Sequence, residues 1–226
     1  MLGTFVNCIA IIIGSLIGLV FKKGIPQRFG DTVMHGLALC VMYIGISGAF
    51  EGVNVLITII SIVLGAVIGE LLDLDGKINK LGIKIENKFK SNKSDVSIAE
   101  GFVTASLLFC VGAMAIVGAI QSGMSGNHQT LFAKSLMDGI SSIVLSASMG
   151  IGVVLSAIFV LIYQGVITLC SEFASMLLTD IVVSEMTAVG SLLIIGLSLN
   201  LLGITKMKIM NYIPAIFIPI ILCNFM

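Results

Sequence analysis

Seven long apolar runs constrain this chain more than any other feature. Each is close to the about 20 residues that an α-helix needs to cross the hydrocarbon core of a membrane. Because 58% of the 226 residues are hydrophobic and only 11% are charged, a water-soluble domain could not bury this much apolar surface. The sequence therefore predicts an all-α, polytopic integral membrane protein with a single transmembrane domain over residues 1–226. The runs are 4–21, 33–50, 54–72, 101–121, 151–170, 187–204 and 210–225.

An eighth run, 132–150, is more polar, because it contains Lys134, Asp138 and five serines. Backbone at membrane depth must satisfy its own hydrogen bonds or line a cavity inside the protein. We therefore expect a short or broken helix that faces the interior of the bundle. Counting it gives eight passes, with seven as the alternative.

The basic residues predict an orientation. They gather in three segments, 22–31, 73–97 and 205–209, whereas the loop after the second run has no lysine or arginine. With eight passes and both termini outside, all three segments lie in the cytoplasm, which is the positive-inside pattern. Seven passes would leave Lys206 and Lys208 outside.

Segment 73–97 has the pattern of an amphipathic helix. Its apolar and basic residues form neighbouring stripes at helical spacing, so we expect a helix on the cytoplasmic membrane surface that connects the third and fourth passes. Segment 171–185 predicts a second surface helix, on the outside. In segment 73–97 the apolar stripe consists of Leu74, Ile78, Leu81, Ile85 and Phe89, and the basic stripe consists of Lys77, Lys80, Lys84 and Lys88.

Two short self-matches suggest an internal repeat. Phe5-Val6 resembles Phe102-Val103, and the segment around His35 resembles the segment around Asp138, at offsets of 97 and 103 residues. If the first three helices and the next three are repeats, their topologies are opposite, because three is odd. Inverted repeats are a recurrent plan of transporters. A competing match, Gly45 to Gly52 with Gly196 to Gly203, would instead pair the second and seventh helices.

Asp138 is the most informative polar residue. A charge at the centre of a membrane helix costs about 2.5–3.5 kcal/mol on insertion scales, and such residues usually serve a function inside the bundle. In that interpretation Asp138 binds a cation or proton, with Lys134 one turn away as its partner. In the alternative, the pair lies at the outer interface and Lys134 extends to the headgroups.

Other polar residues are candidates for the pathway. Asn127 and His128 lie in a polar, glycine-containing loop that predicts either an outer gate or an ordinary loop. Asn7, Gln164 and Asn200 are amides inside apolar runs, where they line a pathway or join helices by hydrogen bonds. His35 gains interest only from its match to Asp138.

Small residues indicate where helices approach closely. Gly14 with Gly18, and Gly65 with Gly69, have the spacing of close-packing faces between helices or between protomers.

Several classes of site are excluded. The five cysteines are scattered singly, so neither a disulfide framework nor a metal site is expected, and no cofactor is implied. No catalytic signature is present, so an enzyme is not expected. Twelve basic and twelve acidic residues give no net charge and no like-charge run, which argues against nucleic acid as a partner.

Three stretches resemble a known family. They are GTFVNCIAIIIGSLIGLVFKKGIP, CVGAMAIVGAIQSG, and KSLMDGISSIVLSASMGIGV followed by YQG. They resemble the bacterial membrane-protein family known as domain of unknown function 554, over essentially the whole chain. That family is usually labelled as one of transport proteins, so the resemblance implies transport and names no solute or site residue.

These features together predict a transporter or channel-like protein of the cytoplasmic membrane that moves a small solute or ion. A polar site is expected at the break between the fourth and fifth helices, with Asp138, Asn127 and Gln164 as solute or ion ligands. No ATPase motif is present. A homodimer is expected, because eight short helices barely enclose a pathway. The alternative is a membrane scaffold or sensor whose basic segment contacts a cytoplasmic protein.

Overall fold

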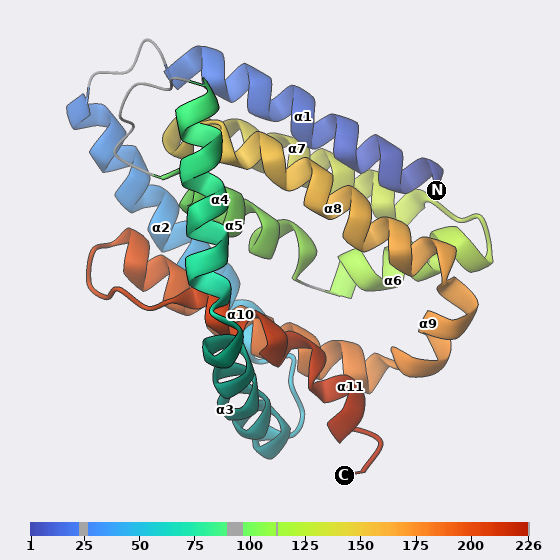
Figure 1. Ribbon diagram of the computed structural model, residues 1–226. Coiled ribbons are helices and arrows are strands. Elements are labelled where there is room, and N and C mark those ends of the chain that lie inside the picture. The colour runs from blue at the N-terminus through green and yellow to red at the C-terminus, as the bar shows by residue number, and fades with distance from the viewer. Residues whose placement is uncertain (23–26, 90–96, 112, 226) are drawn as a thin grey trace.

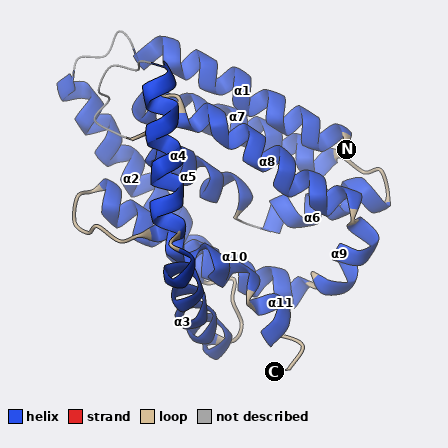
Figure 2. Ribbon diagram, viewed as in Figure 1, coloured by secondary structure: helices blue, strands red, loops and turns tan. Residues whose placement is uncertain are grey.

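The computed structural model describes residues 1–22, 27–89, 97–111 and 113–225. Within these ranges every regular element is a helix and no strand is present (Figure 2). The prediction of an all-α chain is therefore confirmed. The elements are α1 (Leu2–Lys22), α2 (Gln27–Ala49), α3 (Val55–Leu72), α4 (Leu74–Phe89), α5 (Ile98–Cys110), α6 (Ala113–Met124), α7 (Gln129–Met149), α8 (Gly152–Leu169), α9 (Ser171–Leu177), α10 (Asp180–Leu201), the 3-10 helix η1 (Ile209–Phe217) and α11 (Pro219–Leu222).

Four of the described helices are long and apolar enough by themselves to cross a membrane. A fifth span results if α5 and α6, which are bent by 61° at their junction, are taken together. Two further apolar stretches, His35–Ala49 and Ile209–Leu222, are shorter. The four long spans are Leu2–Phe21, Val55–Leu72, Gly152–Leu169 and Asp180–Leu201.

The apolar run 101–121 is not one helix. Helix α5 ends where Val111 takes an extended conformation (φ −79°, ψ 132°), and α6 continues in a different direction. The sequence indicates one apolar run here but not its bend, because periodicity of apolar residues does not report a bend within an apolar run.

Segment 132–150 was expected to be short or broken, and this prediction is wrong. It lies in α7, a continuous helix of 21 residues. Its serines do not interrupt the helix, and the hydroxyls of three of them, Ser135, Ser142 and Ser146, donate to backbone carbonyls. Ser135 donates to Leu131 at 2.6 Å, and Ser146 donates across to Ser15 of α1 at 2.7 Å. A Ser hydroxyl bonded to a carbonyl one turn back is compatible with helical backbone.

The expected outer surface helix, 171–185, is also shorter than predicted. Helix α9 ends at Leu177, and α10 begins at Asp180 with the Thr179 side chain accepting from the amide of Val182. Thr179 is an N-cap residue, which marks the start of a helix. Residues 180–185 therefore belong to the long helix α10.

The last apolar run, 210–225, forms a 3-10 helix followed by one short turn of α-helix. Pro214 lies inside η1 and Pro219 begins α11. Proline has no backbone N–H and clashes with the preceding turn, so a continuous α-helix is disfavoured here.

Helix α4 lies across the front of the molecule in Figure 1, over α5. It covers the first part of the predicted amphipathic segment 73–97. Residues 90–96, and the side chains of 81–82 and 84–89, lie outside the described part of the chain.

Helix α1 packs along α7 at very short range. A Cβ atom added to Gly14 would overlap the carbonyl of Gly139, and one added to Gly18 would overlap the carbonyl of Ile143. The absence of side chains at these two positions therefore permits close backbone contact between α1 and α7.

Helix α3 packs in the same way on η1. A Cβ atom at Gly65 would overlap the backbone of Ala215, and one at Gly69 would overlap the carbonyl of Asn211. Both glycine pairs thus lie at contacts between helices of one chain.

Large apolar side chains cover the outside of the bundle. On α1, Ile9, Ile13 and Val20 are exposed, and on α3, Val63 and Val67 are exposed. A water-soluble monomer rarely exposes so much contiguous apolar surface. These faces fit contact with lipid.

Candidate functional site

Three helices bring a cluster of polar side chains together inside the molecule. Helices α1, α7 and α8 run side by side (Figure 1) and contribute Asn7, Asp138 and Gln164. The Nδ2 atom of Asn7 donates to Oδ2 of Asp138 at 3.0 Å and to Oε1 of Gln164 at 3.2 Å. The side chains of Asn7 and Gln164 are fully buried, and Asp138 is 6% exposed.

Lys134 completes the cluster from the same helix as Asp138. Its Nζ atom lies 2.9 Å from Oδ1 and 2.9 Å from Oδ2 of the carboxylate. Lys134 is only 7% exposed, so it does not extend outward as the interfacial alternative requires. The ion pair expected from the spacing of four residues lies inside the bundle.

Two polar atoms of the cluster have no hydrogen-bond partner among the described residues. They are Oδ1 of Asn7, which is an acceptor, and Nε2 of Gln164, which is a donor. More than 90% of buried polar groups in proteins are hydrogen-bonded, and an unpaired one costs about 1–3 kcal/mol. The presence of an unpaired donor and an unpaired acceptor in one buried cluster therefore requires an explanation.

Hydroxyl groups continue the cluster toward one end of α1 and α8. Thr4 lies one turn before Asn7, Thr168 lies one turn after Gln164, and their Oγ1 atoms are 3.3 Å apart. Thr168 also lines a cavity of about 630 Å³. The buried cluster thus approaches an open cavity through two hydroxyls. The cavity is lined by Met1, Ser122, Gly123, Thr168, Leu169, Cys170, Ser171, Glu172 and Phe173.

The loop between α6 and α7 lies at this cavity and not in the buried cluster. Oγ of Ser122, a lining residue, is 2.8 Å from Nδ1 of the half-buried His128. Asn127 is exposed, and its Oδ1 accepts from the amide of Gln129 at 3.1 Å. The predicted candidate His128 therefore lies beside a residue that lines the cavity, and Asn127 is exposed in the same loop, so neither lies beside Asp138.

Two other candidates lie outside the cluster. Asn200 braces the turn after α10, because its Nδ2 donates to the carbonyl of Met207 at 2.7 Å and its Oδ1 accepts from Thr205 at 2.6 Å. His35 is exposed on α2. Neither residue contributes to the group around Asp138.

A buried carboxylate on α10 was missed by sequence reasoning. Glu185 is fully buried, and its Oε1 accepts from the amides of Val53 at 2.8 Å and Asn54 at 2.6 Å. These amides belong to the loop that leads into α3, where a carboxylate is favoured by the helix dipole. Assigning 171–185 to a surface helix made Glu185 look solvated, although it lies inside the apolar helix that follows.

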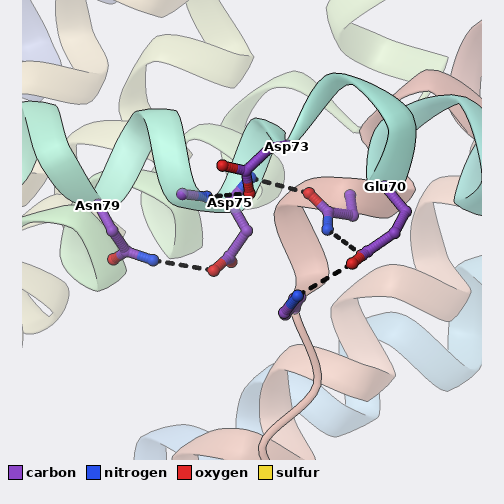
Figure 3. A network of polar contacts seen from close by, with 7 residues as sticks. Glu70, Asp73, Asp75 and Asn79 are labelled. Carbon is purple, nitrogen blue, oxygen red and sulfur yellow. Dashed lines mark hydrogen bonds and ion pairs between the residues drawn. The ribbon is translucent and has the colours of Figure 1, made fainter.

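A further polar network joins the junction of α3 and α4 to η1 (Figure 3). Oε1 of Glu70 lies 3.0 Å from Nζ of Lys208, and the Oδ1 atom of Asn211 accepts from the amide of Asp75 at 2.8 Å. Asn211 also donates to Glu70. The hydrogen bond and charge of Glu70 raise the pKa of Lys208 above its ordinary value. This network links the basic segments 73–97 and 205–209.

The geometry offers no metal centre within the described ranges, since no group of three or more His, Cys, Asp or Glu side chains is close enough to hold an ion.

A bundle of apolar helices that encloses a charged pair and two amides is the architecture of a helical membrane protein, and this chain is one. The family model of Protein of unknown function (DUF554) matches residues 2–224, so the chain belongs to that family. It is 34% identical to "Uncharacterized membrane protein YdfK" of Bacillus subtilis (strain 168) over 224 residues, which cover 97% of this chain and 94% of the relative.

A second relative is more distant. The chain is 28% identical to "Uncharacterized protein YqgA" of Escherichia coli (strain K12) over 218 residues, which cover 95% of this chain and 93% of the relative. No solved structure matches the chain.

Proposed function

We propose that this protein moves a small solute or ion across the cytoplasmic membrane through its interior polar cluster. One observation carries the proposal: Lys134, Asp138, Asn7 and Gln164 are buried together among apolar helices, and two of their polar atoms lack partners. Charged residues inside membrane bundles are costly and usually mark a pathway for a solute or ion. Transport gives the buried charges a function, whereas in a scaffold the same side chains would only join the helices by hydrogen bonds.

The route begins at the cavity lined by Thr168 and Ser122 and passes the Thr4–Thr168 hydroxyl pair before it reaches the cluster. No ATP-binding motif is present in the sequence, so movement is passive, ion-coupled or driven by a partner. Asp138 is the one acidic side chain of the cluster. Any coupling to a cation or proton would therefore act through it.

Eight passes would consist of α1, α2, α3, α5 with α6, α7, α8, α10, and η1 with α11. In this arrangement both termini and the cavity face outward. The ion pair of Lys208 with Glu70 supports a common side for segments 73–97 and 205–209. Lys23, and the side chains of Lys22 and Arg28, lie outside the described part of the chain. The inverted repeat of helices 1–3 and 4–6 stays a prediction.

We also propose that the protein works as a homodimer, because so few short helices barely enclose a pathway. The two glycine pairs are used within one chain, so an interface between protomers would have to use other surfaces, such as the exposed apolar face of α3. Light scattering of the purified protein in detergent, corrected for bound detergent, tests this directly. A monomeric mass would contradict the proposal.

Purified protein reconstituted into liposomes provides the test of transport. Uptake of labelled small solutes and of monovalent ions is compared with uptake by protein-free liposomes of the same lipid. The proposal expects at least one solute or ion to enter faster with protein. If none does so in either orientation of the gradient, transport is contradicted and the scaffold alternative is favoured.

A further inference from the structure

The unpaired atoms of the interior cluster define a hydrogen-bonding pattern. Asp138, when ionised, only accepts hydrogen bonds, so Asn7 must turn its NH2 group toward the carboxylate. The same NH2 group donates its second hydrogen to Oε1 of Gln164. Reversing either amide would place two acceptors or two donors against each other. The orientation of both amides is therefore set by Asp138.

This orientation leaves one carbonyl oxygen, Oδ1 of Asn7, and one NH2 group, Nε2 of Gln164, free. Both side chains are fully buried, so these groups cannot be satisfied at the surface. A partner that fits must donate to Asn7 and accept from Gln164. Primary amides, urea and alcohols present such a donor beside an acceptor.

The charges of the cluster argue against an ion as the ligand of the free groups of Asn7 and Gln164. Lys134 lies 2.9 Å from each oxygen of Asp138, so the one acidic and the one basic side chain already neutralise each other. An ion at the free amide groups would have no counter-charge there, and a buried unpaired charge is strongly unfavourable. Glu172 at the cavity is exposed on α9, so solvent screens its charge.

We propose that the cluster binds a small uncharged solute that presents a hydrogen-bond donor beside an acceptor, as a primary amide, urea or an alcohol does. Asn7 accepts from this solute through Oδ1, and Gln164 donates to it through Nε2. This inference rests on the proposed transport function and adds the substrate class. The hydroxyls of Thr4 and Thr168 offer exchangeable partners on the route from the cavity, because either can be the donor.

The test compares neutral solutes with ions in the same reconstituted protein. Uptake of labelled urea, acetamide and glycerol is measured beside uptake of labelled sodium, rubidium and acetate. We expect at least one neutral solute to enter at least tenfold faster than into protein-free liposomes, and all three ions to enter at the protein-free rate. Entry of an ion without any neutral solute overturns this inference and leaves the transport function standing. If nothing enters, both are overturned.

Variants locate the site. Gln164→Met has similar length and no N–H, so it removes the free donor, and Gln164→Glu keeps an oxygen for Asn7 but replaces the free NH2 group. We expect solute uptake by either variant to be at least tenfold slower than uptake by the wild type. Thr104→Val is the matched control, because it removes an equally buried and unpaired hydroxyl on α5, outside the cluster. It should keep wild-type uptake.

Binding gives a second measurement in case one variant folds poorly. Millimolar solute should raise the thermal midpoint of the wild type and of Thr104→Val, but not that of a folded Gln164 variant. Uptake at the wild-type rate by a folded Gln164→Met or Gln164→Glu protein overturns the assignment of the site.

Discussion

Lys134 and Asp138 lie one turn apart on α7 and form an ion pair that is almost completely buried, with Nζ 2.9 Å from Oδ2. The pair is held from a second helix by the amide of Asn7, which donates to the same carboxylate at 3.0 Å. A buried pair of this kind contributes little net stability compared with apolar residues of similar size, but breaking it is costly. Its position in an apolar bundle thus points to function rather than to stability.

The first prediction concerns the cost of removing only one partner of the Lys134–Asp138 ion pair. Asp138→Asn leaves Lys134 buried without a counter-charge, so we expect it to lower the free energy of unfolding by about 3–5 kcal/mol. Adding Lys134→Met should recover most of that loss, because no buried charge then remains. Thermal unfolding in detergent measures both variants. Equal stability of Asp138→Asn and the wild type would contradict the pairing.

The second prediction concerns contact between α1 and α7. A Cβ atom at Gly14 would overlap backbone that cannot rotate away, so Gly14→Ala should destabilise the protein by about 1–3 kcal/mol. Gly36→Ala is the matched control, since a Cβ atom at Gly36 meets nothing within 4 Å. Alanine there should be neutral or slightly stabilising. Thermal unfolding in detergent measures the stability of both variants. Similar effects at the two glycines would argue against close packing of α1 on α7.

The third prediction concerns the carboxylate of Glu185. Glu185→Leu removes the acceptor of the Val53 and Asn54 amides and should destabilise the protein by about 1–3 kcal/mol. Glu185→Gln keeps an oxygen for these amides and should lose less. Glu51→Leu serves as control, because Glu51 is exposed in the same loop. A Glu185→Leu protein as stable as the control would show that this contact does not anchor α3.

The fourth prediction tests orientation. In a background without native cysteines, Lys80→Cys on α4 should resist a membrane-impermeant thiol reagent added to intact cells. Ser125→Cys in the exposed loop beside the cavity should react. Both positions should react after the cells are opened. The reverse pattern in intact cells would place the basic segments outside and the cavity inside.

The helical class and most helix positions could be predicted from the sequence, because a membrane-spanning helix needs about 20 predominantly apolar residues in succession. The pairing of Lys134 with Asp138 followed from their spacing of four residues. The bend between α5 and α6 could not be predicted, since an apolar run looks the same whether it is straight or bent. In the last run, Pro214 and Pro219 indicate that a continuous α-helix is disfavoured, but they do not specify the 3-10 geometry of η1.

The site was predicted only in part. Asn7, Asp138 and Gln164 were each singled out as polar residues in apolar surroundings, but their contact depends on which faces of α1, α7 and α8 meet. That is a tertiary property, with 131 residues separating Asn7 from Asp138 in the chain. Asn200 has the same local sequence character as Asn7, yet it braces a turn, because its helix ends one residue later at Leu201.

The central claim is that the solute passes through the buried cluster, and uptake by a variant without the ion pair tests it most directly. Asp138→Leu combined with Lys134→Met replaces the pair by apolar side chains of similar size, which should leave the protein folded. In liposomes, with Thr104→Val as control, we predict a loss of at least tenfold in solute uptake by the double variant. Uptake at the wild-type rate by a double variant with wild-type thermal stability would contradict the claim.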